Sequence, residues 1–207
     1  QLTTGCEALG LDVEICSLDS PDADCVLSNK NKVHALGPTQ GSYGYSAQLI
    51  PWLKSHSHEY NIIIVNGLWR YVGFAVRRAL IGKTTPYYVF THGMLDPWFK
   101  RKYPIKHLKK WLYWPWGEYR VLRDARKVIF TCEEERIKAR DSFWLYKANE
   151  TVTTFGVSAP PDNTNYLISK FYSRYPQLKG KRVVLYLSRI HEKKGCDLLI
   201  DAFAHIT

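Results

Sequence analysis

The chain has 207 residues, enough to bury a sizeable core in one large domain or in one domain and part of a second. Its composition, 45% apolar and 23% charged, is that of an ordinary globular protein and excludes a collagen-like or disordered chain. The formal net charge of +10 predicts an anionic partner, and by itself it does not choose among nucleic acid, anionic lipid and phosphorylated small molecules.

Six short runs rich in β-branched and aromatic residues predict the strands of a buried parallel sheet, at 12–18, 61–66, 86–91, 127–131, 151–155 and 182–188. Segments with helical spacing alternate with them, at 45–55, 68–81, 105–122, 133–144 and 195–206. This alternation predicts an α/β fold with a Rossmann-like, doubly wound parallel sheet. In such sheets ligands bind beyond the carboxyl ends of the strands, so the residues that follow each strand are the first candidates for a site.

A domain connection is predicted at 155–181, where a glycine, two adjacent prolines and a polar cluster occur together. We place the first domain at 1–157, the linker at 158–181 and the beginning of a second domain at 182–207. Because 182–207 holds only one strand, one loop and one helix, it cannot be a complete domain. We therefore expect the chain, which opens at Gln1 without a signal peptide, to be a fragment.

The five cysteines suggest a reducing compartment. Their number is odd, and they form neither a CxxC pair nor a spacing typical of a metal site. We expect reduced, mostly buried thiols in a cytoplasmic protein, with no metal.

A first candidate site follows the strand predicted at 86–91. His92 and Gly93 come directly after it, and Asp96 lies a few residues on. An imidazole there can hydrogen-bond sugar hydroxyls or a phosphate, or act as an acid or base near neutral pH. It can equally be a capping histidine in a strand-to-helix turn, and Asp96 before a proline is more typical of a helix N-cap.

A second candidate is the basic loop that precedes the last predicted helix. Arg189 offers a planar fork of donors, Lys194 offers a compact cation, and Gly195 lets the backbone approach a ligand at the start of a helix, whose amides favour anions. These features suit a diphosphate. The alternative is a solvated basic turn.

The positive charge is concentrated between residues 100 and 127, where ten lysines and arginines face only Glu118 and Asp124. Aromatic residues are interleaved with them, and the candidate contact residues are Lys106, Lys109, Lys110, Trp111 and Trp114. This pattern suits an anionic membrane surface or an anionic acceptor. Single-stranded nucleic acid and a helix that simply packs its aromatics on the sheet are the alternatives.

Four stretches, in order, resemble the retaining GT-B glycosyltransferases of family four. "YLSRIHEKKGCDLLIDAF" (186–203) is similar to the start of their second domain, and "YSAQLIPWLKSHSHEYNIIIVNGLW" (45–69), "FTHGMLDPW" (90–98) and "VIFTCEEERI" (128–137) are similar to parts of their first. The resemblance implies transfer of a sugar from a nucleotide-sugar donor to a polysaccharide or lipid-linked acceptor, with retention of configuration and without a metal or other cofactor.

The resemblance also implies roles for individual residues. Arg189 and Lys194, with Gly195, match the positions that bind the donor diphosphate and stabilise the leaving group. His92 matches a histidine over the donor sugar, and Asn66 ends a strand where many relatives carry histidine, as a possible acceptor contact. The first domain would hold the acceptor at the inner face of the cell membrane, and the second would bind the donor, while no nucleic acid partner is implied.

Two functional classes therefore remain open. The first is a glycosyltransferase, of which residues 1–207 alone should be inactive because the acidic residues that hold the donor sugar would lie beyond them. The second is a non-catalytic α/β binding protein that uses its basic aromatic surface on an anionic membrane or nucleic acid.

Overall fold

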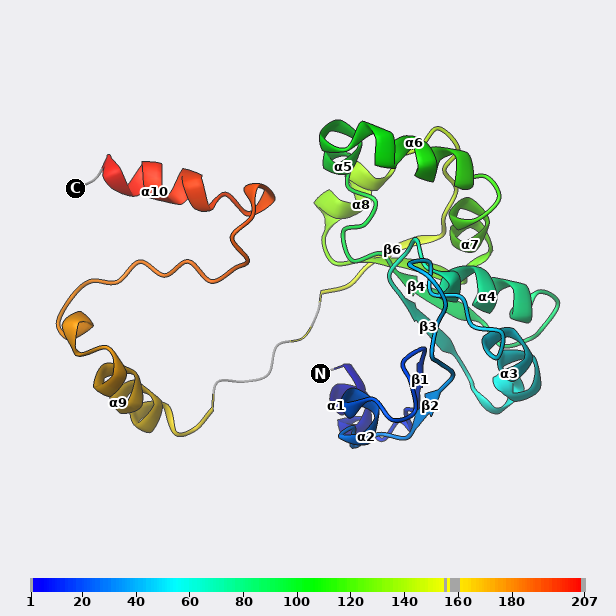
Figure 1. The fold of residues 1–207 in the computed structure, drawn as a ribbon, viewed down its shortest axis with the longest axis horizontal. Helices are drawn as coiled ribbons and strands as arrows, with labels where there is room; N and C mark the ends of the chain where they lie inside the picture. Colours follow the sequence, from blue (N-terminus) through cyan, green and yellow to red (C-terminus); the bar gives the residue numbers. More distant parts are fainter. Residues whose placement is uncertain (1, 155, 157–160, 206–207) are drawn as a thin grey trace. The chain divides into compact units, whose positions relative to one another are not determined.

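The computed structural model describes residues 2–154, 156 and 161–205 (Figure 1). The chain divides into two compact units, Gln1–Val157 and Ser158–Thr207. The start of the domain connection predicted at 155–181 lies mostly outside the described residues, which omit 155 and 157–160.

The main sheet of the first unit has four parallel strands in sequence order: β3 (Ile63–Asn66), β4 (Tyr87–Phe90), β5 (Lys127–Phe130) and β6 (Glu150–Val152). All four were predicted, and the α/β fold with a parallel sheet is confirmed. Val65 pairs with Val89, and Val89 pairs with Val128. The side chains of Val89, Val128 and Phe130 are completely buried, as expected for central strands covered on both faces.

A smaller parallel pair precedes this sheet. It consists of β1 (Ile15–Ser17) and β2 (Val33–Ala35), and the helices α1 (Leu2–Ala8) and α2 (Asp24–Leu27) accompany it. Only the first of these two strands was predicted, because it lies within the longer apolar run at 12–18, whereas Val33–Ala35 follows a polar stretch and shows no periodic pattern.

Helices pack on the main sheet in an order close to the predicted one (Figure 1). The first are α3 (Leu49–His56), continued by the short 3-10 helix η1 (Ser57–Glu59), and α4 (Tyr71–Leu80). Helix α4 contacts α3, β3, β4 and α7 (Glu118–Asp124), whereas α8 (Glu133–Ala139) contacts β5 and β6. The core between them includes Leu49, Leu53, Ala75, Val121 and Leu122.

Two helices replace the single helix predicted at 105–122. After α5 (Trp98–Lys102), helix α6 (Pro104–Tyr113) ends before Pro115, and α7 begins at Glu118. Pro115 lacks the N–H that a continuous helix needs, and Gly117 has the non-helical angles φ −107° and ψ −100°. The helix predicted at 133–144 likewise ends early, at Ala139.

The second unit is largely helical. Its elements are α9 (Thr164–Arg174), the 3-10 helices η2 (Pro176–Leu178) and η3 (Glu192–Lys194), and α10 (Cys196–Ala204). Helix α9 lies inside the segment predicted as a linker. Residues 182–188, all of them described, form no strand, contrary to the prediction, because no neighbouring strand supplies the hydrogen bonds of a ladder.

Two further sequence predictions can be compared with the described residues. The five cysteines are unpaired, but none is buried, so the expectation of mostly buried thiols was wrong. No helix among the described residues is both long enough and apolar enough to cross a bilayer.

Candidate functional site

The candidate site lies at the edge of the main sheet where the parallel strands end. Asn66 is the last residue of β3, His92 follows β4 by two positions, and Thr131 follows β5 directly. A hollow of about 330 Å³ opens at this edge, within the size range of small-molecule sites. It is lined by His92, Gly93, Asp96, Thr131, Cys132, Glu134, Glu135 and Lys138.

His92 occupies an unusual backbone conformation. Its φ of +49° lies in the left-handed region, which a non-glycine residue enters at a cost of about 1–2 kcal/mol, and Gly93 follows with φ +72°. The exposed imidazole stacks on Phe90, and its Nε2 lies 3.1 Å from Asn66 Oδ1. Because an amide oxygen can only accept, Nε2 carries the proton in this contact. The structure thus brings together His92, Gly93 and Asn66.

Glu135 of α8 holds this turn in place. Its Oε1 accepts from the Gly93 N–H at 2.7 Å and from Thr91 Oγ1 at 2.6 Å. Its Oε2 accepts from the backbone N–H and from the hydroxyl of Thr131, both at 2.8 Å. Burial alone would raise the pKa of Glu135, but the donors from Thr91, Thr131 and Gly93 outweigh it and leave the pKa lowered. One ionised carboxylate therefore ties the loop after β4 to the loop after β5.

A second carboxylate, Glu118, supports the loop after β3. It is completely buried at the start of α7, and its Oε1 accepts from the Trp69 N–H at 2.5 Å. Trp69 is also left-handed, with φ +68°. Burial raises the pKa of Glu118 to about 7, because one backbone donor and the nearby Lys110 ammonium offset only part of the desolvation. Among the described residues, Glu118 Oε2 has no hydrogen-bond partner.

Asp96 is not the N-cap of α5, as its capping alternative predicted, but lies one residue before the N-cap, Pro97. Its Oδ1 accepts from the Trp98 N–H at 2.9 Å, immediately before α5. Its side chain also lines the hollow beside His92. This hydrogen bond gives Asp96 a local structural role in the turn before α5.

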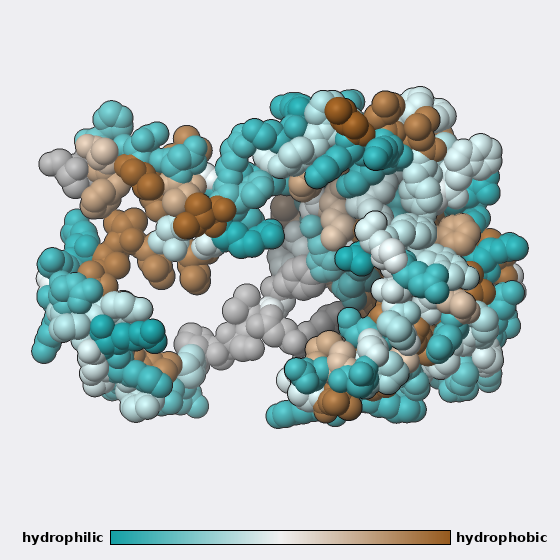
Figure 2. All heavy atoms as spheres, viewed as in Figure 1, coloured by the Kyte–Doolittle hydropathy of each residue, from teal (hydrophilic) through white to brown (hydrophobic). Residues whose placement is uncertain are grey.

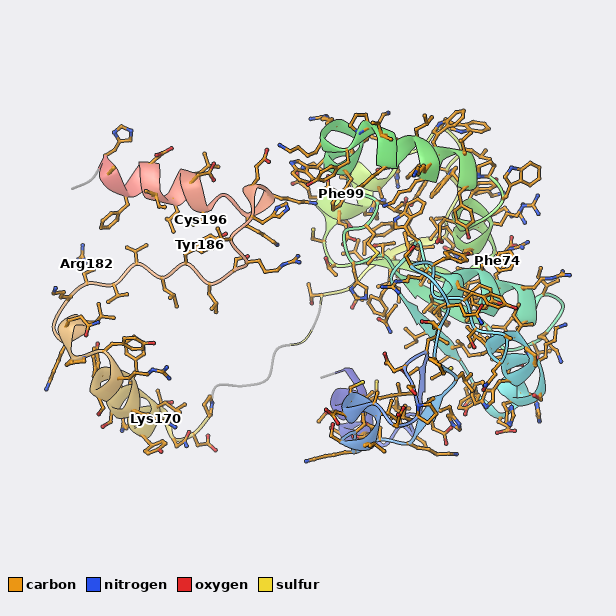
Figure 3. All side chains as sticks on the ribbon, in the orientation of Figure 1. Phe74, Phe99, Lys170, Arg182, Tyr186 and Cys196 are labelled. Carbon is orange, nitrogen blue, oxygen red and sulfur yellow. The ribbon has the colours of Figure 1, made fainter. Side chains whose placement is uncertain are left out.

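The basic loop of the second unit leads into a helix, as predicted. Gly195 is left-handed, with φ +64°, and α10 starts at the next residue. The hydroxyl of Tyr186 lies 3.3 Å from the carbonyl oxygens of both Arg189 and Lys194. Figure 3 labels Tyr186 and Cys196, on either side of this loop. The backbone of both predicted diphosphate ligands is thus held by one hydroxyl group.

The five candidates for a membrane or acceptor surface divide into three groups. Lys106, Lys109 and Trp111 are exposed on α6. Lys110 turns inward, where its Nζ lies 4.3 Å from the centre of the Trp69 ring. Trp114 is completely buried, stacked on Phe143 at 4.1 Å, so its assignment to the surface was wrong.

Metal-ligating side chains do not gather in the part of the chain that the structure describes: no group of three or more His, Cys, Asp or Glu there could hold an ion. The absence of a metal from the reaction stays a prediction.

Glu135 and Glu118 were both missed from the sequence. Glu135 has a readable signal, because Cys132 is the N-cap of α8 and Glu135 stands three positions on, the spacing of a capping box. Glu118 has no such signal. A glutamate in the first turn of a helix is usually exposed, and only the packing of α7 against α4 buries this one.

The family model for the glycosyl transferase 4-like domain matches residues 1–154. No curated protein and no solved structure matches the chain. The matched residues cover most of the chain and contain the whole main sheet, the hollow beside His92 and the carboxylates of Glu118 and Glu135. The chain belongs to the glycosyl transferase 4-like family.

Proposed function

We propose that the protein transfers a sugar from a nucleotide-sugar donor to a glycan or lipid-linked acceptor with retention of configuration. The observation that carries the proposal is the polar hollow beside His92, at the sheet edge where α/β proteins bind their ligands, in a chain of the glycosyl transferase 4-like family. The protein binds the acceptor in the cytoplasm, at the inner face of the membrane. No metal or other cofactor takes part.

In the proposed reaction, an acceptor hydroxyl forms a bond to the anomeric carbon while the bond from that carbon to the diphosphate breaks. The hydroxyl attacks on the face from which the diphosphate departs and gives its proton to the departing diphosphate oxygen, so the step balances and the configuration is retained. Negative charge grows on the leaving diphosphate, and Arg189 and Lys194 stabilise it, with Gly195 giving the backbone close access.

His92 is proposed to lie over the donor sugar and to hydrogen-bond it. Three features of its surroundings support this role. The Glu135 carboxylate fixes Gly93, the side chain of His92 lines the hollow, and Asn66 orients the imidazole. Asn66 is proposed as a contact for the acceptor, on the same side of the sheet. A loop fixed in this way loses little conformational entropy when the donor binds.

Sugar transfer by the full-length protein tests the proposal, because residues 1–207 alone are expected to be inactive. A panel of nucleotide sugars is offered with glycan and lipid-linked acceptors, and release of nucleoside diphosphate and the anomeric configuration of the product are measured. Arg189→Ala should lower transfer by about two to three orders of magnitude, on the scale of losing one contact to transition-state charge. Arg182→Ala, an exposed arginine of the same unit, is the matched control and should transfer normally.

The outcomes separate the two functional classes. Transfer that depends on Arg189 and His92 supports the proposal, and a product of inverted configuration would overturn the retaining mechanism. Binding of anionic lipid or nucleic acid with no transfer from any donor would favour the non-catalytic binding protein.

A further inference from the structure

Helix α6 has its polar side chains on the inward face and its aliphatic ones on the outward face, the reverse of an ordinary surface helix. Its inward side chains are polar: His107 stacks on Phe143, Lys110 covers the Trp69 ring, and the Tyr113 hydroxyl hydrogen-bonds that of Tyr43 at 2.5 Å. A helix on the surface of a globular protein normally does the reverse and buries its apolar side.

The outward face of α6 is aliphatic. Ile105 is 75% exposed, Leu108 56% and Leu112 61%, and their spacing of three and four residues places them in one stripe. Trp111 flanks this stripe, and Trp116 follows the helix with 68% of its surface exposed. Figure 2 shows hydrophobic side chains interspersed with hydrophilic ones along the upper edge of the molecule, where Figure 1 places α6.

The charge around the stripe has one sign. No acidic residue occurs between Asp96 and Glu118, and this interval contains Lys100, Arg101, Lys102, Lys106, Lys109 and Lys110. Lys106 and Lys109 are exposed on α6 itself, and Arg120 lies over the Trp116 ring at 5.4 Å. The face therefore offers aliphatic side chains, indole rings and cations together.

We infer that this outward face of α6 (Ile105, Leu108 and Leu112, with Trp111, Trp116, Lys106 and Lys109) docks on a bilayer that contains anionic lipid. Aliphatic side chains enter the acyl boundary, indoles settle at the level of the headgroups, and lysines contact lipid phosphate. Nucleic acid fits less well, because its bases bind by stacking on aromatic rings and its backbone binds cations, so it offers nothing to a leucine stripe.

The inference deepens the proposed function, since it places the acceptor side of the reaction at a lipid surface. It does not depend on catalysis, because vesicle binding can be measured whether or not the protein transfers sugar. A full-length protein that binds vesicles but transfers no sugar would overturn the proposed function alone, and one that transfers sugar but does not bind vesicles would overturn this inference alone.

Flotation of the full chain with vesicles provides the test. Vesicles of phosphatidylcholine are compared with vesicles that also contain phosphatidylglycerol, at low and high salt. We expect binding to the anionic vesicles that weakens as salt rises. The double variant Leu108→Gln and Leu112→Gln should reduce the partition coefficient by at least about tenfold, because two leucine side chains no longer enter the bilayer. Lys106→Gln with Lys109→Gln should weaken binding only to the anionic vesicles.

Matched controls change the same chemistry elsewhere. Leu27→Gln alters another exposed leucine, and Lys54→Gln with Lys83→Gln removes two exposed lysines away from α6. Both should bind as the unchanged protein does, and circular dichroism confirms that every variant is folded. Failure to bind anionic vesicles, or an equal loss in the controls, would overturn the inference. So would a dimer that only the leucine variants dissociate, or oligonucleotide binding that replaces vesicle binding.

Discussion

Two loops at the edge of the main sheet are held by carboxylates whose pKa values are shifted in opposite directions. The loop after β3 is held by Glu118, which accepts one backbone hydrogen bond, is completely buried and has a pKa raised to about 7. The loop after β4 is held by Glu135, which accepts four hydrogen bonds and has a lowered pKa. Each of these loops contains a non-glycine residue in the left-handed region, Trp69 in the first and His92 in the second.

The two carboxylates differ both in depth and in the number of donors: Glu118 is completely buried with one donor, whereas Glu135 is only partly buried and accepts four hydrogen bonds, and both differences favour ionisation of Glu135. Four hydrogen-bond donors replace the water that the Glu135 carboxylate loses on burial. Glu118 has one donor, and among the described residues its second oxygen has no hydrogen-bond partner. The loop that carries His92 is thus fixed by a permanent charge, and the loop that carries Trp69 is fixed by a group that gains or loses a proton near neutral pH.

Replacing Glu135 should produce the largest change. Glu135→Gln should lower the free energy of unfolding by about 3–5 kcal/mol, because an amide has one oxygen to serve two backbone N–H groups, those of Gly93 and Thr131. Whichever way the amide turns, one of these N–H groups faces an NH₂ group. Urea unfolding measures the loss, and sugar transfer should fall with it because the His92 turn is released.

Glu133→Gln is the matched control for this change. Glu133 lies on the same helix, is 64% exposed and pairs with Arg136. The control should lose no more than about 0.5 kcal/mol, as an exposed ion pair does. Equal losses in the two variants would mean that the four hydrogen bonds of Glu135 do not hold the loop.

The second prediction concerns pH and the other carboxylate. The unfolded Glu118 titrates near 4.5 and the folded one near 7, so between these values the unfolded chain releases its proton first. Stability contributed by Glu118 is therefore complete below pH 4.5 and is lost as the pH rises to about 7, by up to about 3 kcal/mol. Lys110 is the cation that faces it, and burial raises the pKa of Tyr113, which is neutral throughout this range.

Unfolding of the unchanged protein and of Glu118→Gln at pH 5 and pH 8 measures this effect. The variant keeps an acceptor for the Trp69 N–H and cannot ionise. Its free energy of unfolding should therefore rise relative to that of the unchanged protein as the pH rises. Glu135→Gln should run parallel to the unchanged protein between pH 5 and pH 8, because a pKa lowered from 4.5 makes the contribution of Glu135 complete above pH 4.5 and lets it fade only in more acidic solution. Parallel pH profiles for all three proteins would contradict the comparison.

Much of this edge of the sheet could be predicted from the sequence, because parallel strands leave a strong apolar pattern and their carboxyl ends must meet. That reasoning placed His92 and Gly93 at this edge, and the family resemblance added Asn66; the structure brings the three together. The carboxylates were missed for a physical reason: a run of three glutamates at 133–135 does not say which one points back into the sheet, since this depends on where the helix begins.

The strand predicted at 182–188 does not form, because a strand also depends on residues outside its own sequence. Its apolar, β-branched residues are suited to a sheet, but a strand is defined by hydrogen bonds to a neighbour, and none is present in the described part of the second unit. The same limit applies to α6, whose leucine stripe predicts a helix but not which side of it faces the core. Local pattern predicts the element, and tertiary contacts decide its surroundings.

The smallest predicted effects compare the glycines of the two loops. Gly67 has φ +85° and Gly93 φ +72°, so alanine should cost about 1–2 kcal/mol of unfolding free energy at either position. An alanine Cβ at 93 would meet no atom within 4 Å, whereas at 67 it would lie 3.1 Å from Met94 Cε. Because Met94 also accepts the Leu68 N–H through its sulfur, displacing it should add about a few tenths of a kcal/mol.

Gly82→Ala, at φ +75° in open space, is the control for backbone strain alone. Chemical unfolding should therefore rank Gly67→Ala below Gly93→Ala in stability, with Gly93→Ala equal to Gly82→Ala. A much larger loss at Gly93 would show that the His92 turn depends on its backbone geometry as strongly as on the Glu135 carboxylate.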